Sequence, residues 1–214
     1  MPDRENCILR IKRWTAGIVP ALLACALIQA NYACAGDRGP AGGHPGHEGM
    51  QIHDRGIALL TDHAYYTSLI SDLGRARQDI IIIMYLFKPT GHVSALPDHI
   101  VDMLIGKRRQ GTDVTVILNI DQKSSLHGGA DDVDRANMDA AKALEHKGIK
   151  VYFDSLHRIT HAKVVVIDKS IVYIGSHNLT QSALRYNHEV SVRIVSPALA
   201  EELARYAEAL KQER

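Results

Sequence analysis

Four polar side chains that suit chemistry on a phosphate group lie within the stretch 161–178. His161 and Lys163 are two residues apart, so on a strand their side chains point to the same face. Ser176 and Asn178 are spaced in the same way. An imidazole that can act as nucleophile or base, beside an ammonium, a hydroxyl and an amide, suits the binding of an anionic, phosphate-like group.

The segments that carry these residues predict how they meet. Residues 163–167 and 171–175 are short apolar runs joined by Asp168-Lys169-Ser170, a pattern typical of a β-hairpin. A hairpin places the start of its first strand beside the end of its second strand. The four polar side chains are therefore expected at one edge of a sheet. Apolar residues on both faces of 163–167 predict that this strand is buried.

The rest of the domain alternates between strand-like and helix-like segments. Short apolar runs, many of them β-branched, predict strands at 56–60, 79–87, 113–120, 149–153, 163–167, 171–175 and 189–195. Helical periodicity and end signals predict helices at 64–76, 97–110, 131–147 and 197–211. This order, with a hairpin late in the chain, predicts an α/β fold: a mixed β-sheet flanked by helices.

The spacing H-x-K-x4-D-x6-G-S-x-N resembles the HKD signature of the phospholipase D superfamily. The resemblance extends over roughly residues 57–212 and includes the segments 148–151 and 187–189 on either side of the motif. The chain looks most like the small bacterial endonucleases of the Nuc type, which carry one HKD copy per chain and a signal peptide. The resemblance implies the phospholipase D/nuclease-like fold.

The resemblance also implies a role for each residue at the expected site. His161 would attack phosphorus and form a phosphohistidine intermediate, which water then hydrolyses. Lys163, Ser176 and Asn178 would hold the phosphoryl oxygens as charge builds in the transition state. Glu189 matches an acidic position that, in such enzymes, accepts a hydrogen bond from the histidine and fixes its tautomer.

Two further positions near the motif are interpreted differently. Asp168 lies in the hairpin turn at an odd offset from Lys163, so we interpret it as structural support for the site rather than as a phosphate contact. His177 departs from the family pattern, which more often has an apolar or aromatic residue there. The long polar segment 122–134 is a second departure. Both departures concern substrate choice more than chemistry.

The function implied is that of a metal-independent phosphodiesterase, an endonuclease that cleaves DNA or RNA without a cofactor. In-line displacement needs a nucleophile and an acid for the leaving oxygen, whereas one motif supplies one histidine. The resemblance therefore implies a homodimer in which two motifs meet across a two-fold axis. The alternative is a phospholipase D-type hydrolase acting on phospholipid head groups. A third hypothesis is a non-catalytic binding protein on the same fold, against which the intact motif argues.

The first 35 residues differ in kind from the rest. A basic start, an apolar centre at 18–28 and the closing Ala33-Cys34-Ala35 predict a bacterial signal peptide over 1–35, and therefore a periplasmic or secreted protein. The uncharged run is also long enough for an uncleaved inner-membrane anchor, which would be the only membrane contact. The sequence ending at Cys25 loosely resembles a lipobox.

A linker rich in glycine, proline and histidine is expected at 36–55, before a catalytic domain at 56–214. His44, His47 and His53 are interpreted as incidental rather than as metal ligands, because no carboxylate framework accompanies them. No metal site is expected in the chain.

Composition and charge limit the remaining function classes. The 214 residues are 46% hydrophobic and 23% charged, which excludes a disordered, collagen-like or coiled-coil protein. The formal net charge of +1 gives no general affinity for polyanions, so nucleic-acid binding requires a local positive cleft.

Three smaller polar clusters complete the candidates. The run 107–109, Lys-Arg-Arg, could contact nucleic-acid phosphates or serve the end of a helix, and the sequence leaves both open. The aspartates in 131–134 are interpreted as a helix N-terminus rather than a calcium site. His157 and Arg158 are expected to line the active cleft.

Overall fold

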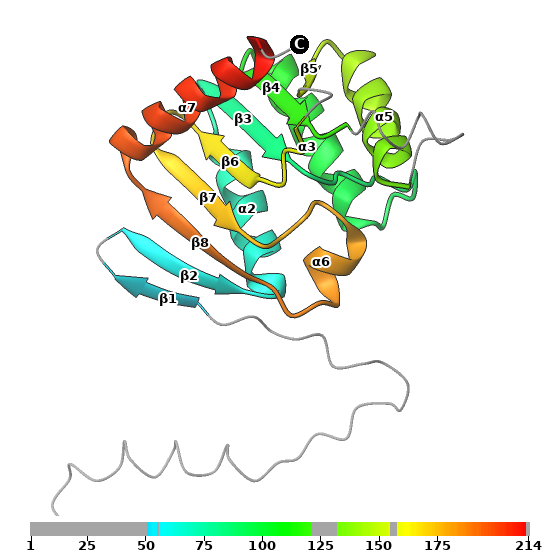
Figure 1. The fold of residues 1–214 in the computed structure, drawn as a ribbon. Coiled ribbons are helices and arrows are strands. Elements are labelled where there is room, and N and C mark those ends of the chain that lie inside the picture. Colours follow the sequence, from blue (N-terminus) through cyan, green and yellow to red (C-terminus); the bar gives the residue numbers. More distant parts are fainter. Residues whose placement is uncertain (1–50, 55, 121–131, 155–157, 213–214) are drawn as a thin grey trace, which may run out of the picture. The chain divides into compact units, whose positions relative to one another are not determined.

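The computed structural model describes residues 51–54, 56–120, 132–154 and 158–212, all within the compact unit Pro45–Arg214 (Figure 1). An eight-stranded sheet runs in the order β1-β2-β8-β7-β6-β3-β4-β5. Its strands are β1 Gln51–Asp54, β2 Ile57–Thr61, β3 Asp79–Met84, β4 Asp113–Leu118, β5 Lys150–Phe153, β6 Lys163–Ile167, β7 Ile171–Gly175 and β8 Val190–Val195. The helices are α2 His63–Arg75, α3 Leu96–Arg109, α5 Asp132–Glu145, α6 Gln181–Arg185 and α7 Pro197–Gln212.

The sheet is mixed, and its register determines which strand ends meet. Strands β3, β4 and β5 are parallel, whereas β6 pairs antiparallel with β3, bringing Met84 opposite Lys163. Strand β7 returns antiparallel to β6 and ends at Gly175, which pairs with Ser191 near the start of β8. The ends of β3 and β7 and the starts of β6 and β8 therefore lie along one side of the sheet. We call this side the motif edge.

Each face of the sheet has its own apolar core. Val165 and Ile167 face the larger core, which α2, α3, α5 and α6 cover. Val164 and Val166 face a smaller core under α7, which packs on β3, β4, β6 and β7. All five residues of β6 are buried, as its apolar pattern predicts. The mixed α/β sheet flanked by helices is confirmed (Figure 1).

Several elements differ from the expectation. Strand β1 lies inside the range 36–55 that was expected to be linker, because it pairs with β2 although it lacks an apolar run. Strand β3 ends at Met84 rather than residue 87; beyond it, Phe87 forms an isolated parallel bridge with Leu179. The short helix α6 was not expected, and its N-cap Thr180 accepts a hydrogen bond from the backbone of Ala183.

Some predictions fall outside the described residues. These are the signal peptide at 1–35, His44, His47, Asp131 and His157, with most of the polar segment 122–134. Helix α5 begins at Asp132 and carries Asp132 and Asp134 in its first turn, so the helix N-terminus predicted there is confirmed. Within the described ranges, no helix has the length and apolar character needed to cross a bilayer.

Candidate active site

His161 and Lys163 form the centre of the site at the motif edge. The Lys163 ammonium lies 3.3 Å from each ring nitrogen of His161 and donates a 2.9 Å hydrogen bond to the His161 carbonyl oxygen. The lysine side chain is largely buried, whereas His161 is exposed. Burial lowers the pKa of Lys163 and the negative charge of Glu189 opposes this, with burial the larger influence. The pair thus combines an accessible imidazole with a partly desolvated cation.

Tyr85 lies against both members of this pair. Its ring centroid is 4.5 Å from that of His161, with the planes tilted by 55°, and 4.9 Å from the Lys163 nitrogen. Its backbone N–H donates to the Ala162 carbonyl, which continues the β3–β6 pairing past the last strand residue. The motif does not include Tyr85, which lies within an apolar run that predicts only a buried strand. The available signal was its aromatic side chain, two residues before the end of that run at Phe87.

The second half of the site follows β7. The Ser176 hydroxyl donates to the Glu189 carboxylate and accepts from the Val190 backbone N–H at 3.0 Å. Asn187 donates a second hydrogen bond to Glu189, at 3.2 Å. The Asn178 side-chain oxygen is buried and has no hydrogen-bond partner among the residues that the structure describes. An amide oxygen can only accept, so a contact between Asn178 and a phosphoryl oxygen would use the side-chain NH2 group of Asn178.

The structure corrects one contact that the resemblance implied. Glu189 was expected to accept a hydrogen bond from His161, but in the described chain this bond is not formed. The start of β8 runs beside Ser176, so Ser176 and Asn187 are the donors that reach the Glu189 carboxylate. Glu189 still belongs to the site, because its charge acts on Lys163.

Gly175 is required by the close approach of β8. A Cβ atom built at Gly175 would lie 2.2 to 2.5 Å from the Oγ, Cα and Cβ atoms of Ser191. Real Cβ atoms do not come so near, and the backbone atom cannot rotate away. The glycine of the motif therefore lets β7 and β8 pair closely just before the chain turns into Ser176.

His177 points into the interior rather than toward substrate. It is 1% exposed and stacks on Tyr65, with ring centroids 4.2 Å apart. Its Nε2 lies 3.0 Å from the Asp62 carbonyl oxygen and its Nδ1 lies 2.7 Å from the Ser191 hydroxyl. Because a carbonyl can only accept, Nε2 carries the proton. Burial lowers the pKa of His177, and the neighbouring acceptor and acidic groups only partly oppose this.

Asp168 lies at the opposite end of β6 from Lys163. Its carboxylate accepts hydrogen bonds from the backbone N–H groups of Arg77, Gln78 and Asp79, at 2.7 to 3.3 Å. These bonds hold the connection between α2 and β3. The structure therefore does not bring Asp168 together with His161, Ser176 or Glu189.

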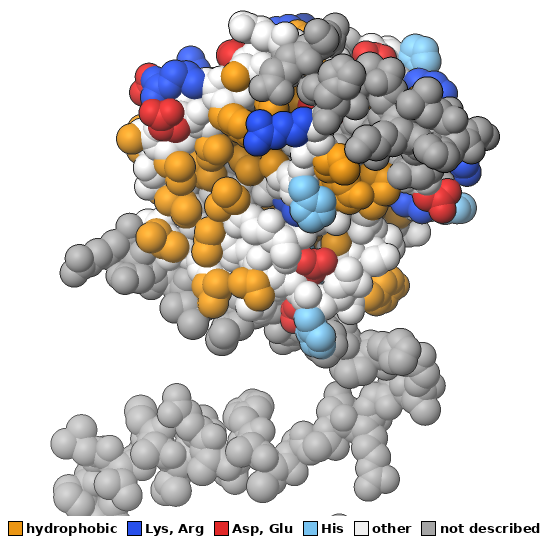
Figure 2. All heavy atoms as spheres, viewed as in Figure 1, with side chains coloured by type: hydrophobic (Ala, Val, Ile, Leu, Met, Phe, Trp, Pro, Cys, Tyr) orange, Lys and Arg blue, Asp and Glu red, His pale blue; other side chains and the backbone are white. Residues whose placement is uncertain are grey.

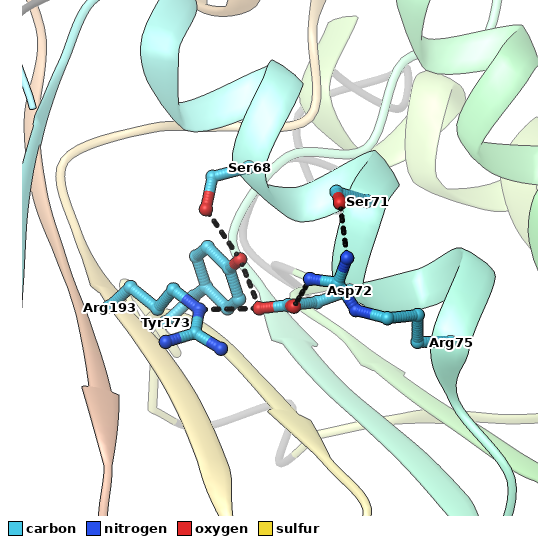
Figure 3. Close-up of polar contacts among 6 residues, drawn as sticks. All are labelled: Ser68, Ser71, Asp72, Arg75, Tyr173 and Arg193. Atoms are coloured by element: carbon cyan, nitrogen blue, oxygen red, sulfur yellow. Dashed lines mark hydrogen bonds and ion pairs between the residues drawn. The ribbon is translucent and has the colours of Figure 1, made fainter. Parts of the chain in front are cut away.

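A buried ionic network joins strands β7 and β8 to helix α2 (Figure 3). Asp72 of α2 accepts hydrogen bonds from Tyr173 at 2.6 Å, Arg193 at 2.5 Å and Arg75 at 2.6 Å. Desolvation alone would raise the pKa of Asp72, but these three donors together outweigh it, and the pKa lies below its usual range. Tyr173 comes from β7, which directly precedes Ser176, and Arg193 comes from β8, which directly follows Glu189. The network thus fixes both strands on α2.

Amide side chains fix the loops of the motif edge. Asn137 of α5 is fully buried; it donates to the carbonyl oxygens of Tyr85 and Asn119, at 2.8 and 2.9 Å, and accepts from the backbone of Phe87. Asn119 in turn accepts from the Thr160 N–H at 3.0 Å, directly before His161. These contacts link three loops, so a helix remote in sequence helps to place the histidine.

The basic residues 107–109, in the last turn of α3, have a structural role. The Lys107 ammonium is buried and donates to the carbonyl oxygens of Gly74 and Ala76 at the end of α2. Arg108 donates to the carbonyl of Gly148. The run lies at the sheet edge opposite the motif, so these contacts favour the helix-end interpretation over binding of nucleic-acid phosphates at the site.

A sheet edge that presents a histidine–lysine pair, a hydroxyl, an amide and a carboxylate defines a phospholipase D-like domain. The chain belongs to the family described as cardiolipin synthase, phospholipase D-like domain, whose model matches residues 69–211. It is thereby a member of the phospholipase D superfamily.

Curated relatives include cardiolipin synthase A of Erwinia tasmaniensis, 27% identical over 139 residues, and that of Serratia proteamaculans, 29% identical over 127 residues. These matches cover 64% and 56% of this chain but only 27% and 24% of the relatives, so the chain spans about a quarter of their length.

Two solved structures share the fold. Nuc of Salmonella typhimurium, a phospholipase D family member, aligns with a TM-score of 0.57 and 24% identity over 72% of this chain and 93% of Nuc. NucT of Helicobacter pylori aligns with a TM-score of 0.55 and 20% identity over 72% and 94% of the two chains.

Proposed function

We propose that the protein is an exported, metal-independent endonuclease that cleaves DNA or RNA through a phosphohistidine intermediate. The observation that carries this proposal is the direct contact of Lys163 with an exposed His161 beside the Ser176–Glu189 pair. A ring nitrogen of His161 forms a bond to phosphorus while the bond from phosphorus to the leaving oxygen breaks. Water then attacks phosphorus, releasing the phosphomonoester and restoring the histidine. Lys163 and Asn178 bind the phosphoryl oxygens throughout.

Positive charge at the motif edge supports a polyanionic substrate. Lys88, Arg158 and Arg185 are exposed, and they lie in the segments that follow β3, precede β6 and join β7 to β8, the strand ends that form this edge. The chain as a whole is nearly neutral, so such a local cluster is the kind of surface that nucleic-acid binding requires.

A homodimer is part of the proposal, because one chain offers one histidine where the leaving oxygen also needs an acid. The sheet face under α7 offers a surface for it. Beyond the helix, Ile57, Ile174 and Val190 are 49%, 39% and 56% exposed, and by register they share that face. Figure 2 shows hydrophobic side chains gathered over β7, β8 and β2. An apolar patch of this kind suits a two-fold contact between copies.

The second candidate function is phospholipid head-group hydrolysis or transfer, with the same chemistry at His161. Two observations favour it. The family model and the curated relatives are those of cardiolipin synthases. In addition, three large apolar side chains on the loops of the motif edge, Val93, Ile159 and Tyr186, are 95%, 57% and 61% exposed. Such side chains could contact a bilayer surface around the site.

One set of assays separates the two candidates. The protein without residues 1–35 is incubated with plasmid DNA, RNA and phosphatidylglycerol vesicles, each with EDTA. Cleavage of nucleic acid alone supports the nuclease, and turnover of lipid alone supports the second candidate. Loss of cleavage in EDTA overturns the metal-independent mechanism, and full activity of His161→Ala overturns the proposed nucleophile.

The dimer has its own test. Ile57→Glu places a charge on the apolar face away from the histidine. Val195→Glu is the matched control, because Val195 is 48% exposed on the other face of the same sheet. Sedimentation should show a monomer for Ile57→Glu only, with activity lost at the same time. A fully active Ile57→Glu monomer contradicts the shared site.

Processing is tested by expression in a bacterial host. Export is supported by a mature N-terminus near residue 36 in the periplasmic fraction. A full-length chain that stays with the inner membrane supports the anchor instead.

A further inference from the structure

Glu189 is held by a residue far from it in sequence. Asp62, at the end of β2, donates its backbone N–H to the Glu189 carbonyl at 2.9 Å. Its side-chain Oδ1 accepts from the Glu189 N–H, also at 2.9 Å. The two residues therefore close a ring of two hydrogen bonds, one position beyond the last β2–β8 pair, Thr61 with Val190.

The side chain of Asp62 binds Glu189 instead of capping helix α2. Asp62 is the N-cap residue of α2, a position where an aspartate normally accepts from the N–H groups of the first helical turn. Here it makes no such capping bond. Its backbone has φ of 49° and ψ of −131°, a left-handed region that costs an L-residue free energy and persists only where surrounding contacts impose it.

The other groups around Asp62 also lead to the site. The Asp62 carbonyl accepts from His177, which lies between Ser176 and Asn178. Its Oδ2 lies 3.7 Å from Nδ1 of His188, the residue before Glu189. Asp62 thus contacts both segments that carry the second half of the site, while its own side chain contacts no residue of the His161–Lys163 pair.

We propose that Asp62 is a positioning residue for Glu189: its Oδ1 fixes the Glu189 backbone so that the Glu189 carboxylate meets Ser176 and acts on Lys163. This inference rests on the proposed function only in assigning Glu189 a part in the reaction. The positioning itself is a property of the folded chain and can be measured without turnover.

The test compares Asp62→Gly with Asp62→Asn. Glycine accepts the left-handed backbone but removes Oδ1, so any loss comes from the missing acceptor rather than from strain. Asparagine keeps an oxygen acceptor and removes only the charge. Asp98→Gly is the matched control, since its carboxylate also holds two backbone N–H groups at the motif edge, those of Thr90 and Gly91.

With bis(p-nitrophenyl) phosphate as substrate, kcat of Asp62→Gly should fall about tenfold or more with little change in KM. Asp62→Asn should stay near the parent value, and Asp98→Gly should lose stability but not kcat. Unchanged kcat in Asp62→Gly, or an equal loss in Asp62→Asn, overturns the inference.

A second readout does not depend on turnover. Because Glu189 raises the pKa of Lys163, a displaced Glu189 should lower it, and the Lys163 side chain can be titrated by NMR. Asp62→Gly should lower this pKa as Glu189→Gln does, while Asp62→Asn should not. An unshifted titration in Asp62→Gly overturns the inference, even if no substrate is found. A parent protein inactive on every phosphodiester counts against the proposed function alone.

Discussion

Lys163 holds its ammonium nitrogen at the same distance, 3.3 Å, from both ring nitrogens of His161. A single N–H cannot point at both nitrogens, so the contact fixes a position rather than one directed hydrogen bond. The directed bond is the one to the His161 carbonyl, at 2.9 Å. The lysine is thereby held at the imidazole with donors left for a phosphoryl oxygen.

The protonation state of Lys163 should make the activity depend on pH. Burial lowers its pKa from the usual 10.5, so the ammonium loses its proton at a lower pH than a free lysine would. We expect kcat/KM to fall on the alkaline side as this charge is lost. Glu189→Gln should move the fall to lower pH, because Glu189 opposes the effect of burial. Profiles of kcat/KM against pH for the parent and for Glu189→Gln check both expectations. If the alkaline fall occurs at the same pH in the two proteins, Glu189 does not influence the pKa of Lys163.

Gly175→Ala should be strongly destabilising. The added methyl would meet the backbone and side chain of Ser191 within 2.5 Å, which forces β7 and β8 apart. Overpacking of this kind costs about 1–3 kcal/mol or more in the free energy of unfolding, measured by urea denaturation. Gly106→Ala is the control, because its Cβ meets nothing within 4 Å and it lies inside α3. That variant should gain about 0.5–1 kcal/mol.

Sequence patterns predicted the parts of the fold that depend on local periodicity. The buried strand β6, the hairpin with β7 and the four long helices follow from apolar spacing, and the motif residues fall at one edge because the hairpin places them there. Strand β1 was not predicted, because its four residues lack an apolar run. They form a strand because they pair with β2.

The supporting contacts of the site could not be predicted in the same way. The side chain of Asp62 and the backbone of Glu189 meet across 127 positions of sequence, and Asn137 reaches Phe87 across 50. Such pairs depend on how helices pack on the sheet, which no local spacing reveals. For the same reason a polar residue in the motif, His177, proved to be a core residue: its partners come from β8 and from the start of α2.

Asp72→Asn should reveal how much the buried network contributes. The substitution keeps the shape of the side chain but leaves the guanidinium of Arg193, 21% exposed, without its counter-charge. Removing one partner of a buried pair typically costs about 3–5 kcal/mol. Arg75→Ala should cost about 1 kcal/mol or less, because the Arg75 side chain is 70% exposed. Denaturant unfolding measures the loss of unfolding free energy in each variant. Equal losses would contradict the view that Arg193 and Tyr173, rather than Arg75, are the main partners of Asp72.

His177 should make the protein less stable in mild acid. The pKa of His177 is lowered in the folded state by burial, whereas in the unfolded chain it is near the usual 6.5 of a histidine. Between these two values the unfolded chain binds more protons, so stability falls as pH drops below about 6.5 and levels off once the folded state is also protonated.

His177→Phe should remove this part of the pH-dependence. A phenyl ring can keep the stack on Tyr65, but it loses the hydrogen bonds to Asp62 and Ser191, so we expect a loss of about 1–3 kcal/mol at neutral pH. Below pH 6 the gap between the variant and the parent should narrow, because only the parent must protonate a buried imidazole. Melting temperatures measured from pH 8 to pH 5 provide the comparison, with His99→Gln as a control at an exposed histidine. A gap that stays constant across this range would show that His177 does not titrate on unfolding.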